Sequence, residues 1–215
     1  MRIDFVSDVV CPWCAIGLAS LQEALAEVGG ELGPVEMHIQ PFQLNPDMGP
    51  EGEDIVEHLS HKYGMSPEQV MANQGAIRER AAAVGVDFRM DRRSRTWNTF
   101  DAHRLLYWAG TIGTAEQVAL KTALLRAYFT DGENPADRAV LLREVRTLGL
   151  DEAAAAEVFD QNRFADEVRE ERDAWTQAGI RSVPAIVINQ RHLISGGQPP
   201  AVFAQALRRL AQSAG

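Results

Sequence analysis

The nine residues 9-VVCPWCAIG-17 hold both cysteines of the chain, Cys11 and Cys14, with two residues between them. Two cysteines at this spacing are typical of a redox dithiol, of half a metal site, or of two small buried apolar side chains. The preceding segment 2-RIDFV-6 predicts a short buried strand. Residues 16–28 predict an amphipathic helix, because apolar residues recur there at intervals of three and four. The cysteines therefore belong to a loop between a strand and a helix.

Strands are predicted at two further places. Residues 35–44 predict a second strand, which Pro41 interrupts. Near the other end, residues 185–188 and 192–195 predict two short strands joined by a tight turn, and a helix that begins with proline follows them. The chain therefore opens and closes with elements of a sheet.

Between these segments, from about residue 53 to residue 178, helix signals dominate. Capping boxes at residues 66–69 and 114–117 and a cap at Asp151 indicate three helix starts, and Gly29 and Gly30 are expected to end the first helix of the chain. We predict an α/β fold with two domains: a sheet domain at residues 1–50 and 179–215, and an all-helical insertion domain at residues 51–178.

The composition is that of a globular protein with an acidic balance. About 46% of the 215 residues are apolar, and 21 Lys and Arg against 30 Asp and Glu give a formal net charge of −9. This charge argues against nucleic acid as a partner, because phosphate binding needs clustered cations. Asp4 and Asp8 interrupt the apolar character of the N-terminal residues, and no stretch is apolar enough to span a bilayer, so we expect a cytoplasmic protein without a membrane partner.

The position of the cysteines before a helix favours redox chemistry. In a reducing compartment, a close cysteine pair is catalytic or metal-binding more often than a structural disulfide. Free N–H groups and the dipole at the helix N-terminus stabilise a thiolate at Cys11. Pro12 suits the first helical position, where its missing N–H loses nothing. Cys14, one turn further in, is then the less exposed thiol.

Two other interpretations of the pair stay open at this point. A metal site needs about four ligands, and only His58 and His61 form a close histidine pair that could add to the two thiols. These histidines are more simply interpreted as part of a solvated helix face, so no metal is expected. Two inert buried cysteines are the other alternative.

A second informative stretch, 182-SVPAIVIN-189, lies far from the cysteines in the sequence. Pro184 follows Val183 at the start of a predicted strand, where proline is tolerated. A cis Val183–Pro184 bond is also open, although only about 5% of X–Pro bonds in folded proteins are cis.

Together these stretches resemble the thioredoxin superfamily, and within it the DsbA-like, FrnE-type oxidoreductases. The matching segments are 4-DFVSDVVCPWC-14, 41-PFQLNPDM-48, 96-TWNTFDAHRLLYWA-109, 124-LLRAYFTDG-132 and 179-GIRSVPAIVINQRHLISGGQP-199. The resemblance covers essentially the whole chain. It implies a thioredoxin fold interrupted by a helical insertion, and thiol–disulfide exchange on protein or small-molecule disulfides.

The resemblance also implies roles for individual residues. Cys11 would be the nucleophile and Cys14 the resolving thiol, with Pro184 as a cis-proline facing them. The backbone of Val183 would pair with an extended substrate segment.

Further substrate contacts are implied around the dithiol. Pro12 and Trp13, between the cysteines, would contact the substrate and help to set the reduction potential. Trp97, Asn98 and His103 match positions that face the cleft between the domains, and Asn98 is the candidate for substrate binding. A structural role is open for each, and His103 is expected to be a buried, hydrogen-bonded histidine.

Two carboxylates precede the dithiol. Thioredoxins bury a carboxylate there as a proton acceptor, and Asp4 is the candidate, although it lies one residue further from Cys11 than the resemblance predicts. Asp8 is nearer in sequence and is expected to face solvent in a loop; the alternative is an inward orientation, which would disfavour a thiolate at Cys11.

Four arginines lie close together in 89-RMDRRSRTWN-98. They are most simply a solvated loop, and the functional alternative is a rim that binds an anionic co-substrate such as glutathione. No tightly bound cofactor is expected. The expected partners are proteins with a disulfide or a dithiol, or small thiols, and a homodimer stays open.

The main functional alternative is a glutathione-dependent isomerase or transferase on the same fold. The 2-hydroxychromene-2-carboxylate isomerases and kappa-class glutathione transferases resemble this chain in architecture, and they typically have a serine at the position of Cys11. Two intact cysteines therefore favour redox chemistry. A metal-binding or interaction protein ranks third.

Overall fold

The structure of the chain, a computed structural model, describes residues 1–212. Its first elements are β1 (Arg2–Ser7), α1 (Pro12–Leu32), β2 (Glu36–Pro41), β3 (Glu53–Asp54), α2 (Ile55–Tyr63), α3 (Pro67–Ala82), β4 (Arg95–Thr96) and α4 (Phe100–Ile112). They are followed by α5 (Thr114–Arg126), the π-helix η1 (Ala127–Asp131), α6 (Arg138–Thr147), α7 (Glu152–Asp160), α8 (Ala165–Gln177), β5 (Ala185–Ile188), β6 (His192–Ser195) and α9 (Pro200–Gln212). None of the described helices has both the length and the apolar character needed to cross a membrane.

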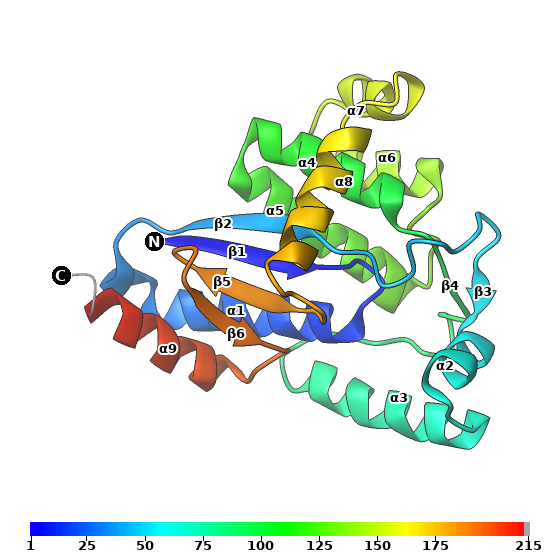
Figure 1. The fold of residues 1–215 in the computed structure, drawn as a ribbon, viewed down its shortest axis with the longest axis horizontal. Helices are drawn as coiled ribbons and strands as arrows, with labels where there is room; N and C mark the ends of the chain where they lie inside the picture. Colours follow the sequence, from blue (N-terminus) through cyan, green and yellow to red (C-terminus); the bar gives the residue numbers. More distant parts are fainter. Residues whose placement is uncertain (213–215) are drawn as a thin grey trace.

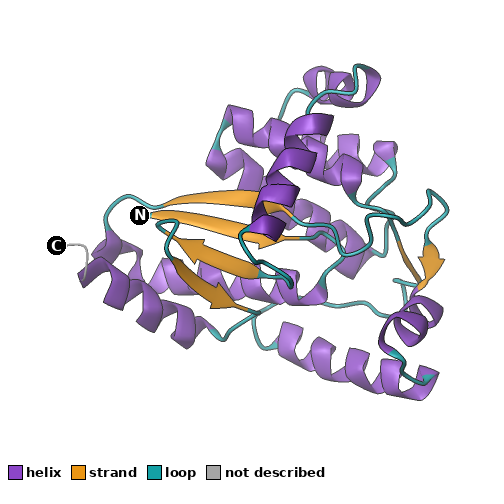
Figure 2. Cartoon of the chain, viewed as in Figure 1, coloured by secondary structure: helices purple, strands orange, loops and turns teal. Residues whose placement is uncertain are grey.

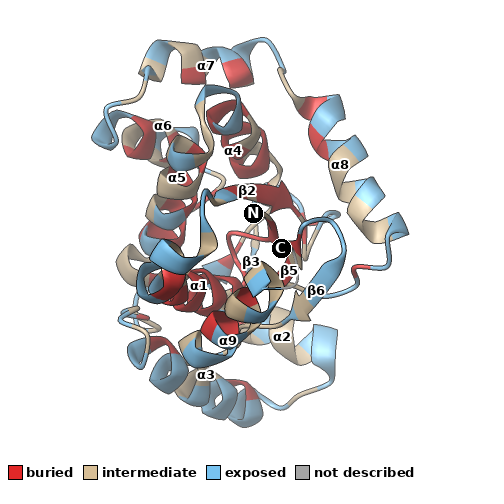
Figure 3. Cartoon of the chain, turned by 90° about the vertical axis from the view of Figure 1, so that its left-hand side faces the viewer, coloured by how far each residue is buried: buried red, intermediate tan, exposed pale blue. Residues whose placement is uncertain are grey.

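Four strands form the central sheet in the order β2-β1-β5-β6 (Figures 1 and 2). β1 runs parallel to β2, where Phe5 lies opposite Ile39, and antiparallel to β5, where Phe5 lies opposite Ile186. Helices α1 and α9 pack against each other on one side of the sheet, and α8 lies on the other side (Figures 1 and 3). This arrangement is an α/β thioredoxin-like fold, which confirms the predicted fold class.

Between β2 and β5 the chain forms the predicted helical insertion, which includes α4 to α8. One detail of the prediction is wrong, because the insertion is not all-helical: β3 and β4 form a two-residue antiparallel pair, with Glu53 opposite Thr96. So short a pair has no alternating pattern that a sequence could show. The insertion shares one continuous core with the sheet domain, since buried Ile3, Leu105 and Leu124 belong to the same cluster (Figure 3). The domain boundaries at residues 50 and 178 stay a prediction.

Helix α1 begins as predicted but ends later. Pro12 occupies its first position, and Cys11 is its N-cap residue. The helix continues through Gly29 and Gly30, so the predicted end there is wrong, and it is followed by Gly33 at φ +67°. Packing of α1 against α9 and the sheet offsets the cost of roughly 1 kcal/mol that each helical glycine carries relative to alanine.

Two of the three predicted helix caps are confirmed. Ser66 and Gln69 form the reciprocal capping box of α3, and the Asp151 carboxylate accepts two backbone hydrogen bonds at the start of α7. The third prediction is wrong, because α5 already includes Thr114 and has no side-chain cap.

The side chain of Gln117 joins α5 to the edge of the sheet instead. Its Oε1 accepts a hydrogen bond from the Ile39 N–H at 2.8 Å, and its Nε2 donates to the carbonyls of Ile39 and Leu106 at 3.1 Å each. Gly110 leaves room for this amide, because a Cβ there would lie 2.7 Å from its nitrogen. The insertion is thereby fastened to β2, the edge strand next to β1.

Candidate dithiol active site

The two cysteines lie where β1 ends and α1 begins. The Cys11 carbonyl accepts hydrogen bonds from the backbone N–H of Cys14 at 3.1 Å and of Ala15 at 3.3 Å, which closes the first turn of the helix. Both cysteines are free and buried; Cys11 is 4% exposed and Cys14 is fully buried. Trp13, between them, points outward and is 38% exposed. The predicted strand–loop–helix placement of the dithiol is therefore confirmed.

The loop before β5 faces the dithiol. The Val183–Pro184 peptide bond is cis, and the Cys11 Sγ lies 3.7 Å from the Val183 carbonyl oxygen. Gly17 permits this approach, because a Cβ there would lie 3.0 Å from Cγ of Pro184. The structure thus brings together Cys11, Val183 and Pro184, which are more than 170 positions apart in the sequence. Substrate binding by the Val183 backbone stays a prediction.

Behind the dithiol lies Asp8, which was expected to face solvent and is instead fully buried. Its carboxylate accepts hydrogen bonds from the backbone N–H groups of Val9 and Leu44, each at 2.7 Å, and lies 3.3 Å from Nε2 of His103. Burial alone would raise the pKa of Asp8, but the hydrogen bond and charge of His103 and the Leu44 N–H hold it below its ordinary value. The loop of Leu44 and helix α4 hide Asp8 from solvent, and their packing could not be inferred from the local sequence.

His103, on α4, is the buried and hydrogen-bonded histidine that was expected. Burial lowers its pKa, and the Asp8 carboxylate opposes that effect. The partner that satisfies His103 is therefore a residue of the dithiol loop, which links the insertion directly to the cysteines.

Lys121, on α5, is the second titratable residue that the insertion contributes. It is fully buried, and its Nζ has no hydrogen-bond partner among residues 1–212. Burial lowers the pKa of Lys121, and the charges of Cys14, Asp8 and Cys11 act in the opposite direction. A cation in this position stabilises negative charge on the dithiol and on Asp8.

The same surroundings act on Cys14. Burial, followed by the hydrogen bond and charge of Cys11, raises the pKa of Cys14 well above its ordinary value. Lys121 and the backbone N–H of Asp8 oppose this shift. Cys14 is therefore a thiol when Cys11 attacks, and the groups that favour its deprotonation lie directly behind it.

Asp4, the predicted proton acceptor, has a different environment. It is buried, but its carboxylate is bound by the guanidinium of Arg2 at 2.7 Å and by Nε2 of Gln40 at 2.8 Å. The side chain of Gln40 in turn accepts a hydrogen bond from Trp175 of α8, so Asp4 belongs to a network on the α8 side of the sheet. A role for Asp4 in proton transfer stays a prediction, and Asp8 is the carboxylate whose contacts reach the dithiol loop.

A cavity of about 650 Å³ opens at Cys11. Cys11, Pro12 and Trp13 form one part of its wall, together with Val183. Helices α2 and α3 supply nearly half of the remaining wall, through Ile55, His58, Leu59, Lys62, Tyr63, Val70, Asn73, Gln74 and Ile77. The predicted substrate contacts Pro12 and Trp13 thus line a real cavity, whereas its α2–α3 wall was not identified from the sequence.

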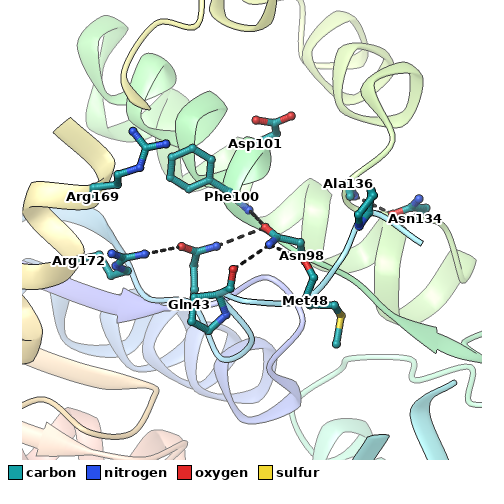
Figure 4. Close-up of a pocket in the computed structure, with 11 residues that line it drawn as sticks. Gln43, Met48, Asn98, Phe100, Asp101, Asn134, Ala136, Arg169 and Arg172 are labelled. Atoms are coloured by element: carbon teal, nitrogen blue, oxygen red, sulfur yellow. Dashed lines mark hydrogen bonds between the residues drawn. The ribbon is translucent and has the colours of Figure 1, made fainter. Parts of the chain in front are cut away.

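Asn98 lies elsewhere, in a second cavity of about 500 Å³ that Figure 4 shows. Its Nδ2 donates to the carbonyls of Pro46 and Met48 at 3.1 and 3.0 Å, and its Oδ1 accepts from the Phe100 N–H at 2.9 Å. Gln43 connects Asn98 to Arg172 of α8 (Figure 4). The amide is thus engaged in holding the loop after β2, and its contact with substrate stays a prediction.

The two histidines of α2, His58 and His61, lie in different surroundings. His58 lies 2.6 Å from a Glu53 carboxylate oxygen and 3.1 Å from the Asn45 side chain, whereas His61 is exposed. Within the described part of the chain, no three His, Cys, Asp or Glu side chains gather as metal ligands.

The fold and this arrangement define a class: a thioredoxin-like protein whose cysteine pair caps a helix opposite a cis-proline. The profile of the DSBA-like thioredoxin domain matches residues 2–208. The chain belongs to this family.

Solved structures agree with this assignment. The structure of a probable DsbA oxidoreductase from Streptomyces coelicolor is 34% identical, with a TM-score of 0.89, and the match covers 99% of this chain and 90% of the other. A 2-hydroxychromene-2-carboxylate isomerase is 16% identical (TM-score 0.73, covering 100% and 98%). The cytosolic disulfide reductase DsbM from Pseudomonas aeruginosa, solved with GSH, is 18% identical (TM-score 0.69, covering 99% and 100%). At these lower identities the last two show similarity of fold alone.

Proposed function

We propose that this protein is a thiol–disulfide oxidoreductase of the FrnE type, with Cys11 as the nucleophile and Cys14 as the resolving thiol. The observation that carries the proposal is the geometry of Cys11, which caps α1, lies 3.7 Å from the Val183 carbonyl and borders an open cavity. Membership of the DSBA-like family supports the same chemistry. The similar fold of a cytosolic disulfide reductase supports a cytoplasmic location and glutathione as a co-substrate.

The reaction follows from the two environments. The Cys11 thiolate attacks one sulfur of a substrate disulfide, forms a mixed disulfide and releases the other substrate sulfur as a thiolate. Cys14 then loses its proton, attacks the Cys11 sulfur and releases the second substrate thiol, so that two electrons pass to the substrate. The reverse sequence would donate a disulfide. Lys121 and the Asp8 N–H stabilise the Cys14 thiolate that the second step needs.

A redox titration of the dithiol, combined with an insulin-reduction assay, tests this proposal. The protein is expected to reduce insulin when a small dithiol is added as the reductant, and Cys11→Ser is expected to remove that activity. The measured potential, compared with that of the substrate couple, gives the direction of electron flow. For a two-electron couple, a difference of 30 mV corresponds to about 1.4 kcal/mol. If the protein is instead a glutathione-dependent isomerase, the Cys14→Ser variant should keep full activity in a glutathione-dependent isomerase assay. That result would overturn the proposal.

A further inference from the structure

The cavity at Cys11 has a second polar feature, Arg93. Arg93 is one of the four clustered arginines, but unlike its neighbours it is only 5% exposed and lines this cavity. Its guanidinium lies over the rings of Tyr128 and Phe129, at 5.4 and 5.0 Å from their centroids. The aromatic rings therefore hold a cation in the cavity wall.

Within residues 1–212, this cation has no carboxylate partner. Among residues 1–212, Nε of Arg93 has no hydrogen-bond partner, and the polar contact made by Nη2 is to the Met90 sulfur at 3.4 Å. Burial lowers the pKa of Arg93, and the charge and hydrogen bond of the neighbouring Tyr128 side chain oppose that shift without supplying a carboxylate. A buried charge without a counter-ion costs several kcal/mol, so a feature of this kind in a cavity wall indicates that the counter-ion comes from a ligand.

The other arginines of the cluster are accounted for differently. Arg89 forms a two-pronged ion pair with Asp91 at the surface. Arg95 donates to the carbonyls of Glu51 and Gly52. Of the three arginines with assigned contacts, Arg93 alone keeps an unused donor inside the cavity.

A second unused donor lines the same cavity. Nε2 of Gln74, on α3, is buried and has no hydrogen-bond partner within the described residues. Arg93 and Gln74 come from different segments, and both groups donate and do not accept. A ligand group that satisfies them must be an acceptor, and a carboxylate fits both the charge and the number of donors.

We propose that this cavity is the binding site for a small disulfide that carries a carboxylate, with the carboxylate on Arg93 and Gln74 and the sulfurs at Cys11. This inference rests on the proposed function and adds its substrate class. The same cavity wall also includes the apolar side chains of Ile55, Leu59 and Ile77, which suit an aliphatic linker. The reaction balances without a further reagent: the protein dithiol gives two electrons and two protons to the disulfide, which leaves as two thiols, and Cys11–Cys14 is oxidised.

The test compares charged and neutral disulfides on the reduced protein. The probes are 3,3′-dithiodipropionate and 4,4′-dithiodibutyrate, which carry carboxylates, and bis(2-hydroxyethyl) disulfide, which is neutral. Oxidation is followed by acid quench and mass spectrometry, and each rate is divided by that of dithiothreitol with the same probe. The wild-type protein is expected to prefer at least one dicarboxylate by about tenfold, as a charge-assisted contact implies.

Variants locate the source of the preference. Arg93→Met is expected to lower the rate with the preferred dicarboxylate about tenfold and to change the neutral rate less than about twofold. Gln74→Leu, on a helix surface, is expected to act in the same direction by a smaller factor, and it serves as the test if Arg93→Met does not fold. Arg92→Met, at an exposed neighbouring position, is the matched control and is expected to change neither rate.

Each contrary result has a definite meaning. Equal losses with charged and neutral probes, no preference in the wild-type protein, or the same effect in Arg92→Met would each overturn the carboxylate site while leaving the oxidoreductase proposal intact. If no probe oxidises the wild-type dithiol although the protein is active in the insulin assay, the carboxylate site is overturned; if the protein is inactive in both assays, the proposed function itself fails.

Discussion

Cys11 and Cys14 are three residues apart and lie in opposite environments. Cys11 borders a cavity that α2 and α3 enclose, whereas Cys14 is sealed against Asp8, with Lys121 behind it. One turn of helix is enough to direct one sulfur outward and the other inward. The division between attack and resolution therefore depends on what the rest of the fold places on each side.

The helical insertion supplies both sides. Its α2 and α3 form the wall on the Cys11 side, and its α4 and α5 contribute His103 and Lys121 on the Cys14 side. The sheet domain supplies the cysteines and the cis-proline loop, and the insertion supplies most of the groups that distinguish one sulfur from the other. Changes on either side should therefore affect different steps of the reaction.

The largest effect is expected from removing one sulfur at a time. Cys14→Ser should lose all turnover in insulin reduction while Cys11 still forms mixed disulfides, because attack needs only the outward thiol. Mass spectrometry of the protein after incubation with a disulfide should detect that adduct. Cys11→Ser should lose both turnover and adduct; an adduct on Cys14 in that variant would contradict the assignment of roles.

Lys121→Met is expected to have the next largest effect. The pKa of Cys14 is raised by burial and held down in part by Lys121, so loss of this cation should raise it further. Since the thiolate is the attacking species, resolution speeds up as pH rises toward that pKa. At pH 7, the variant should resolve a preformed mixed disulfide about tenfold more slowly each time the pKa of Cys14 rises by a further 1. Its pH profile should be displaced to higher pH.

Lys62→Met is the matched control for Lys121→Met, because Lys62 lines the cavity on the Cys11 side. It should leave the pH profile of resolution in place, as measured by stopped-flow release of a chromophoric thiol. If both lysine variants shift this profile equally, Lys121 does not act on Cys14 more than Lys62 does, which would contradict the proposed division between the Cys11 side and the Cys14 side.

Asp8→Asn should cost about 1–3 kcal/mol of stability, because the carboxylate satisfies two buried backbone donors. The pKa of Asp8 is lowered in the fold, so its stabilising effect is complete above the ordinary value and is lost as pH falls through the folded value. The thermal midpoint of the wild-type protein should therefore fall in acid more than that of the variant. Chemical denaturation and thermal scans at several pH values measure both quantities.

The same substitution should also move the resolution step of Cys14 to lower pH, opposite in sign to Lys121→Met, because a negative charge is removed near the thiol. Asp4→Asn provides the comparison, since Asp4 is bound by Arg2 and Gln40 on the other side of the sheet. A shift of the resolution profile in Asp4→Asn, but not in Asp8→Asn, would support the prediction that Asp4 is the proton acceptor.

The smallest effect is expected from Asn98→Ala, away from both sulfurs. Loss of its hydrogen bonds to Pro46 and Met48 should destabilise the protein by about 1 kcal/mol, with the rate of exchange unchanged. Denaturation and insulin reduction measured side by side check this. An unchanged stability with a raised KM would show that Asn98 binds substrate, as the sequence suggested.

The sheet domain could be predicted from the sequence because its signals are local. A short apolar strand, the CPWC loop and an amphipathic helix follow one another directly, and Pro184 begins a strand of recognisable composition. The dithiol followed from those same segments, and the cis-proline that faces it followed from the family resemblance that they carry. Only their contact at 3.7 Å required the structure.

The polar side of the site could not be predicted, because it depends on contacts between distant segments. Asp8 is hidden only when the loop of Leu44 and helix α4 pack over it. Lys121 lies among apolar residues in 118-VALKTALL-125, and a lone cation within that apolar stretch was the one signal that could have identified it. Helix α1 continued through Gly29 and Gly30 for the same reason, since tertiary packing overrides a local preference.

The amide of Gln117 has a consequence for how this sheet can grow. By offering both an acceptor and a donor to Ile39, it imitates one peptide group of a missing neighbouring strand. An edge strand with free backbone groups is a template for pairing with another chain, and at this position that pairing is already occupied by a helix. The β2 edge is thereby protected from strand addition at its centre, so association through the sheet is restricted to the opposite edge, at β6.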